Sequence, residues 1–172
     1  NETFVVGNIG NPYTKEVLKT SEKSYTVAEI SSFQLETVHK FHPIVSAILN
    51  ITPDHLNRHH TMECYAQTKE MISYNQNRKD VCVLNYDDEI LSKKCSANVV
   101  WFGRINRPEV GAFLDGDIIK YTDGENVEDM LNVNDMNLIG THNYENVMAA
   151  ICIAKAAGVP DDIIIRVVKQ FK

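Results

Sequence analysis

Two candidate strands end in side chains that can bind metal ions. Glu29 lies at the end of the β-rich run Tyr25–Ile30. Asp54 and His55 follow the almost wholly apolar run Ile44–Ile51. Ligands of open parallel sheets bind at the carboxyl ends of the strands, and a carboxylate and an imidazole meeting there could hold a hard divalent cation. Either group by itself could equally be a solvated turn, so both interpretations stay open.

A lysine interrupts the apolar face of the helix predicted over Met62–Asn77. Lys69 shares that face with residues at heptad-like spacing: Met62, Tyr65, Ile72 and Gln76. The face should meet the sheet, and burying an ammonium there is costly unless it is paired or loses its proton. A neutral amine is nucleophilic and can be modified. The alternative is that Lys69 buries only its aliphatic stem and exposes its charge.

Two further groups could bind a nucleotide. The segment Gly7-Asn-Ile-Gly10 follows the first candidate strand and could bring backbone amides close to an anion, although an ordinary tight turn explains it as well. Asn143 and Asn146 are three residues apart at the start of a predicted helix, so both amides can lie on one face. An amide can pair with adenine at N6 and N7. The alternative for Asn143 is the N-cap of that helix.

The elements that must position these residues alternate between strands and helices, which predicts an α/β fold with a mostly parallel sheet flanked by helices. Strands are expected at Thr3–Val6, Tyr25–Ile30, Ile44–Ile51, Val81–Asn85 and Asn98–Phe102. Helices are expected at Tyr13–Leu18, Phe33–His39, Met62–Asn77, Asp88–Lys94, Tyr144–Ala157 and Asp161–Phe171. Glycines divide Arg104–Asp135 into three short runs, which predicts a small antiparallel β subsheet.

Composition excludes several classes of protein. The chain has 172 residues and is 44% hydrophobic, as expected of about one globular domain with an ordinary core. A net charge of −6 and scattered Lys and Arg residues argue against a nucleic-acid partner. No apolar run approaches the ~20 residues that span a bilayer. The four cysteines lie far apart without a C-x-x-C pair, which favours free thiols in a reducing cytoplasm. The sequence does not support a zinc site, because the histidines have no clear ligand spacing: His39, His42, His59 and His60.

Taken together, these segments resemble the Mur ligase family of ATP-dependent amino-acid ligases of bacterial cell-wall synthesis. The matching stretches run in family order along the whole chain: Gly7–Gly10, Glu29–Glu36, Leu49–His55 with Arg58 and His59, Tyr65–Lys69, Val83–Asp88 and Gly140–Asn146. The S-S-F-Q-L-E element is typical of members that add D-glutamate to UDP-N-acetylmuramoyl-L-alanine. The resemblance therefore implies a P-loop-type mononucleotide-binding domain, and peptidoglycan synthesis through an acyl phosphate made from ATP.

The resemblance also implies roles for the unusual polar residues in catalysis. Glu29, His55 and Lys69 match residues that serve two Mg²⁺ ions shared with the ATP phosphates. The lysine at the position of Lys69 is carbamylated in the family, which turns a cation into an anionic metal ligand. These three residues are the catalytic and metal-binding candidates.

Binding roles follow from the same resemblance. Asn143 and Asn146 match the asparagines that line the adenine pocket of the family. Asn8 and Ser31 match residues near the reacting end of the UDP-sugar substrate. The implied partners are UDP-N-acetylmuramoyl-L-alanine, D-glutamate and ATP, without nucleic acid or membrane.

The chain also departs from the family pattern. The P-loop element G-x-x-G-K-[ST] is absent, and Asn57 stands where the family commonly has aspartate. We expect residues 1–172 to be a central ATP-binding domain without its first strand and P-loop, with the UDP-binding and C-terminal amino-acid-binding domains absent. Such a domain should be inactive by itself, and its open sheet edge could support a dimer or strand exchange.

Two alternatives remain open from the sequence. One is another ligase of the same superfamily, such as a folylpolyglutamate synthase, which also forms an acyl phosphate. The other is a non-catalytic nucleotide-binding module that keeps the scaffold without the chemistry.

Overall fold

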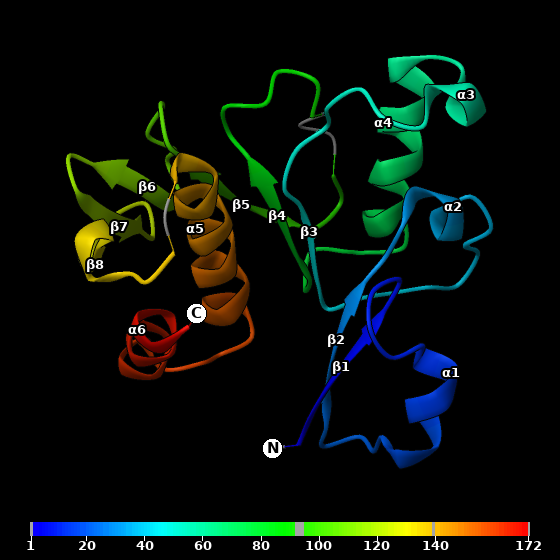
Figure 1. The fold of residues 1–172 in the computed structure, drawn as a ribbon, viewed down its shortest axis with the longest axis horizontal. Helices are drawn as coiled ribbons and strands as arrows, with labels where there is room; N and C mark the ends of the chain where they lie inside the picture. The colour runs from blue at the N-terminus through cyan, green and yellow to red at the C-terminus, as the bar shows by residue number, and fades with distance from the viewer. Residues whose placement is uncertain (1, 92–94, 139, 172) are drawn as a thin grey trace. The chain divides into compact units, whose positions relative to one another are not determined.

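The computed structural model of the chain describes residues 2–91, 95–138 and 140–171 and divides into two units, Asn1–His39 and Lys40–Lys172 (Figure 1). The first unit contains β1 (Thr3–Gly7), α1 (Tyr13–Glu16), β2 (Tyr25–Glu29) and α2 (Ser32–Leu35), with a 3₁₀ turn at Val17–Lys19. Strands β1 and β2 pair in parallel, which confirms both strand predictions to within a residue.

The helix predicted over Phe33–His39 is wrong in its extent. Helix α2 spans only Ser32–Leu35, with its C-cap at Glu36. The side chain of Thr37 donates a hydrogen bond to the carbonyl of Gln34 at 3.5 Å. A β-branched residue whose hydroxyl competes for a backbone carbonyl disfavours continuation of the helix.

The second unit is built on a six-stranded sheet in the order β3-β4-β5-β6-β7-β8. Its strands are β3 (Val45–Ile48), β4 (Val81–Asn85), β5 (Asn98–Gly103), β6 (Gly111–Asp115), β7 (Ile118–Thr122) and β8 (Val127–Asn132). Pairing is parallel from β3 to β6 and antiparallel from β6 to β8. The mostly parallel α/β fold is thus confirmed, and the predicted antiparallel runs continue the same sheet.

Helices cover both faces of this sheet. Helix α5 (Thr141–Ala156) packs on one face and contacts β3, β4, β5 and β6, while α4 (Met62–Glu70) packs on the other. Successive strand residues alternate between the two cores, as the strand period requires, with Val83 facing α5 and Leu84 facing α4. Burial raises the pKa of the Cys82 and Cys152 thiols to about 12, consistent with their predicted role as small apolar side chains.

The remaining helices differ from expectation in three places. A short helix, α3 (Leu56–His59), was not predicted, and α4 gives way to a 3₁₀ turn at Met71–Ser73 rather than continuing to Asn77. The helix predicted over Asp88–Lys94 is wrong: Glu89 and Ile90 lie in a turn and Leu91 in a bend, and positions 92–94 lie outside the described residues. Helix α6 (Asp161–Gln170) confirms its prediction. No helix in the described ranges has the length and hydrophobicity needed to cross a membrane.

A buried glutamine joins the segments that lead into β3 and β4. Gln76 is 3% exposed, and its Oε1 accepts a hydrogen bond from the Ser46 hydroxyl at 2.8 Å. Its Nε2 donates to the carbonyls of Pro43 and Val81 at 2.9 and 3.0 Å. Both polar atoms of the Gln76 amide are therefore hydrogen-bonded. Removing the amide would take this partner away from the Ser46 hydroxyl and from the Pro43 and Val81 carbonyls.

We predict that Gln76→Leu lowers the free energy of unfolding by about 2–4 kcal/mol, because it leaves one hydroxyl and two carbonyls without their hydrogen-bond partner. The matched control is Gln67→Leu on the exposed face of α4, where the amide makes only a 3.4 Å contact with Glu63. Urea unfolding of the two variants measures the difference. Equal stability of both variants would contradict the assigned role.

Candidate functional site

The carboxyl ends of β1 and β2 bring three of the predicted residues together in the first unit. Gly7 pairs with Glu29 in the strand register, and the backbone N–H of Asn8 donates to the Glu29 carbonyl at 2.8 Å. A Cβ on Gly7 would lie 2.1 Å from that carbonyl oxygen, so only glycine permits this approach. Ser31 follows two residues after Glu29, whose side chain is exposed at the same strand end.

Ser31 is the N-cap of α2. Its backbone N–H donates to Gln34 Oε1 at 2.9 Å, while its hydroxyl accepts from the Gln34 N–H at 3.4 Å. This reciprocal pair is a capping box, and the S-x-x-Q spacing in the sequence is its signal. Gln34 therefore fixes the orientation of Ser31, a role that the sequence analysis did not assign.

Lys69 lies at the carboxyl end of β3 in the second unit. The side chain is half-buried on α4, and its Nζ donates to the carbonyl of Asn50, two residues beyond β3, at 3.3 Å. The same nitrogen is 5.1 Å from the ring centroid of Tyr65, which is 4% exposed. The predicted helical face is confirmed, and the amine finds a backbone carbonyl and an aromatic ring as its partners.

His55 lies in the segment that follows the same strand. It has φ 52° and ψ 26°, a left-handed conformation that is uncommon outside glycine, and its carbonyl accepts from Arg58 and His59 to start α3. Its ring Nε2 is 3.4 Å from a carboxylate oxygen of Asp54. The turn thus holds an imidazole and a carboxylate close to each other in the segment between β3 and α3.

The two asparagines occupy the opening turns of α5. The N-cap is Gly140, so the alternative that Asn143 caps the helix is wrong. Asn143 is half-buried and Asn146, one turn further, is exposed. Their side chains can therefore share one face, as the spacing predicted.

The last residue of β4 and two residues that follow it, to which the sequence analysis gave no role, form hydrogen bonds with the ends of the neighbouring strands. The Asn85 amide donates to the Leu49 carbonyl at 3.0 Å, and the Asp88 carboxylate accepts from the Ile51 N–H at 2.7 Å. Asp87 accepts from the backbone of Arg104, which follows β5, at 2.7 Å. These residues form the N-x-D-D pattern at positions 85–88, which was part of the family resemblance. Their hydrogen-bond partners lie far away in the chain, so the sequence pattern did not indicate them.

The predicted metal-binding residues are divided between the two units. Glu29 belongs to the first unit, whereas His55 and Lys69 belong to the second. Within the described residues, no three acidic, histidine or cysteine side chains form a cluster that could hold a metal ion. The convergence of Glu29, His55 and Lys69 on one site stays a prediction.

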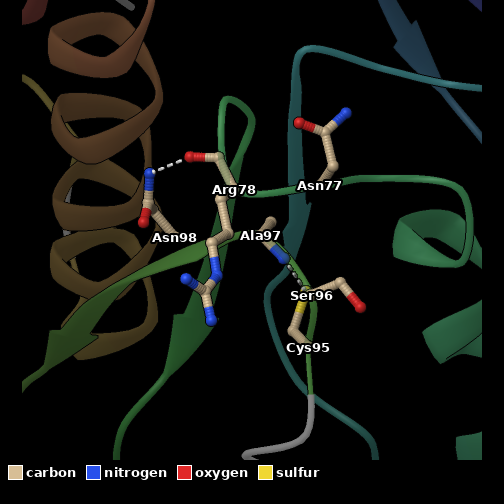
Figure 2. Close-up of a pocket in the computed structure, with 6 residues that line it drawn as sticks. All are labelled: Asn77, Arg78, Cys95, Ser96, Ala97 and Asn98. Atoms are coloured by element: carbon tan, nitrogen blue, oxygen red, sulfur yellow. Dashed lines mark hydrogen bonds between the residues drawn. The ribbon is translucent and has the colours of Figure 1, made fainter.

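A cavity of about 610 Å³ lies at the opposite strand ends (Figure 2). Asn77 and Arg78 precede β4 on its rim, and Cys95, Ser96, Ala97 and Asn98 lead into β5. The Asn98 amide donates to the Arg78 carbonyl at 2.7 Å across it. None of the predicted site residues lines this cavity.

Comparison with known proteins decides the family. The model of the Mur ligase middle domain matches residues 4–154. This chain belongs to the Mur ligase middle-domain family. A UDP-N-acetylmuramoylalanine--D-glutamate ligase of Lachnospira eligens is 73% identical over 99% of the chain, and one of Lachnoclostridium phytofermentans is 53% identical over 98%. The chain spans 39% and 38% of the length of these relatives.

Solved structures agree with the Mur ligase middle-domain fold. A MurF ligase of Thermotoga maritima, solved in complex with ADP, aligns with 99% of this chain and 42% of its own at a TM-score of 0.70. The sequences are 17% identical, so this likeness concerns the fold alone.

Proposed function

We propose that this chain is the central, ATP-binding part of a ligase that adds D-glutamate to UDP-N-acetylmuramoyl-L-alanine in peptidoglycan synthesis. The observation that carries the proposal is the 73% identity, over nearly the whole chain, with a relative named for that activity. The UDP-sugar and amino-acid sites would then be completed by other parts of the whole protein, which would act in the cytoplasm.

The reaction proceeds in two balanced steps. ATP transfers its γ-phosphoryl group to the terminal carboxylate of the acceptor, which gives an acyl phosphate and ADP. The amino group of D-glutamate then attacks the acyl carbon, a C–N bond forms, and phosphate and a proton leave. Asn8 and Ser31 would contact the acceptor near its reacting end, while Asn143 and Asn146 would bind adenine through their amides.

The candidates for binding magnesium beside the ATP phosphates are Glu29, His55 and Lys69. Magnesium prefers oxygen ligands, so the exposed Glu29 carboxylate suits it, whereas the imidazole of His55 would serve as a weaker ligand or orient bound water. Bound magnesium would neutralise phosphate charge and orient the carboxylate. An unmodified Lys69 ammonium would repel the ion.

Carbamylation of Lys69 would remove that conflict. The neutral amine attacks carbon dioxide, an N–C bond forms, and a proton is released, so the cation becomes an anion with two oxygen donors. The carbamate nitrogen keeps one N–H, which could still donate to the Asn50 carbonyl at the position where the amine now does. The half-buried setting of Lys69 is therefore compatible with the modified side chain.

We predict that the whole protein carrying this chain releases phosphate from ATP only when both UDP-N-acetylmuramoyl-L-alanine and D-glutamate are present. Glu29→Ala should lower kcat by about 10²–10³, the usual cost of removing a group that stabilises transition-state charge. The matched control Glu22→Ala changes an exposed carboxylate of the same unit and should leave kcat unchanged. A coupled phosphate-release assay gives both rates.

Other outcomes of this assay decide between the alternatives. Equal turnover with L-glutamate and a folate acceptor would favour a folylpolyglutamate synthase. Magnesium-dependent ATP binding without turnover on any acceptor would favour a binding module. Dimerisation or strand exchange of the 172-residue chain stays a prediction, which light scattering can test.

We predict that the whole protein, equilibrated with ¹³C-labelled bicarbonate, shows a carbamate carbonyl resonance that disappears in Lys69→Arg. Arginine keeps the charge and length but cannot form this carbamate. Lys23→Arg, which changes an exposed lysine, is the control and should keep the signal. A spectrum of the unsubstituted protein without a carbamate resonance would contradict the modification.

A further inference from the structure

Arg104 connects the loop after β5 with the opening turns of α5. Its Nε donates to Glu145 Oε1 at 2.7 Å, and Glu145 lies between Asn143 and Asn146 in the sequence. The two side chains are 33% and 29% exposed, so the pair is partly sheltered and less screened than a surface ion pair. It is therefore placed to restrain the helical turn that carries both asparagines.

The arginine end of this connection is itself fixed. The Asp87 carboxylate accepts hydrogen bonds from three successive backbone N–H groups, those of Arg104, Ile105 and Asn106, at 2.7, 2.9 and 2.9 Å. The Asn106 side chain donates to the same carboxylate at 2.9 Å. Hydrogen bonds to a charged acceptor are among the stronger ones, so the loop presents Arg104 from a well-defined backbone.

The start of helix α5 has no N-cap side chain to accept a hydrogen bond from its first turn. The N-cap of α5 is Gly140, with φ 106° and no side-chain hydrogen bond to the helix, and no acidic residue lies in the first turn. An uncapped first turn frays more readily than a capped one. The ion pair from Arg104 adds a restraint to a helix start that has no N-cap side chain.

We propose that Arg104 and Glu145 are positioning residues for the nucleotide base. The pair holds the opening turns of α5 so that Asn143 and Asn146 present their amides at a fixed spacing. This inference rests on the proposed role of the two asparagines in binding adenine.

The test compares ATP with tripolyphosphate, a probe that has the phosphates but no base, by titration calorimetry on the whole protein with magnesium. We expect Arg104→Met and Glu145→Gln each to weaken ATP binding about three- to tenfold, as for the loss of one partly sheltered ion pair, with tripolyphosphate binding unchanged. The exchanged pair, Arg104→Glu with Glu145→Arg, should recover most of the loss. Amide hydrogen exchange over positions 141–147 should accelerate in the single variants only.

Lys169→Met is the matched control, because Lys169 also ties a helix to a distant segment through a 2.7 Å ion pair, with Asp135. Lys169→Met should change neither the affinity for ATP nor that for tripolyphosphate. Equal weakening of ATP and tripolyphosphate, or no weakening, in the Arg104 and Glu145 variants would overturn the inference. If Asn143→Ala and Asn146→Ala also leave ATP affinity unchanged, the proposed adenine site fails; if they weaken it, that site stands without the positioning role.

Discussion

The carboxyl ends of parallel strands leave backbone groups that need partners, and in the second unit the residues at the end of β4 and directly after it provide them. Asn85 and Asp88 hold the segment after β3, while Asp87 holds the loop after β5. Each tie joins a charged or amide side chain to main chain that is distant in sequence, so a single short segment sets the relative positions of three strand ends. The site proposed here depends on this constraint.

Lys69 shows how the fold accommodates a charge where the helix packs on the sheet. Its amine lies 5.1 Å from the ring centroid of Tyr65 and reaches the Asn50 carbonyl at the strand end. A carbonyl and an aromatic face are partners that suit a cation, so carbamylation of this nitrogen would require it to lose its proton first. His55, in a left-handed turn after the same strand, adds a second polar group, and strained backbone of this kind is common at functional sites.

The sequence predicted the elements that depend on local interactions better than those that depend on contacts between residues far apart in the chain. Strand β4 was predicted to the residue because a buried strand reads as a continuous apolar run. The Asp88–Lys94 helix failed because the Asp88 carboxylate bonds to the Ile51 and Ile90 N–H groups, and the first of these is 37 residues away. Helix α3 depends on the left-handed His55, which no local propensity indicates. The division into two units also left no mark in composition, so the sequence pattern alone could not test the predicted convergence of Glu29 and Lys69.

The central claim is that Glu29, His55 and Lys69 act on the same metal-bound phosphates. The most direct measurement is the anomalous scattering of manganese in crystals of the whole protein with a non-hydrolysable ATP analogue. The account predicts manganese within about 2.0–2.3 Å of a Glu29 oxygen, with His55 and the Lys69 side chain on the same ion cluster. Manganese bound elsewhere, or a Lys69 nitrogen directed into bulk water away from the phosphates, would contradict it.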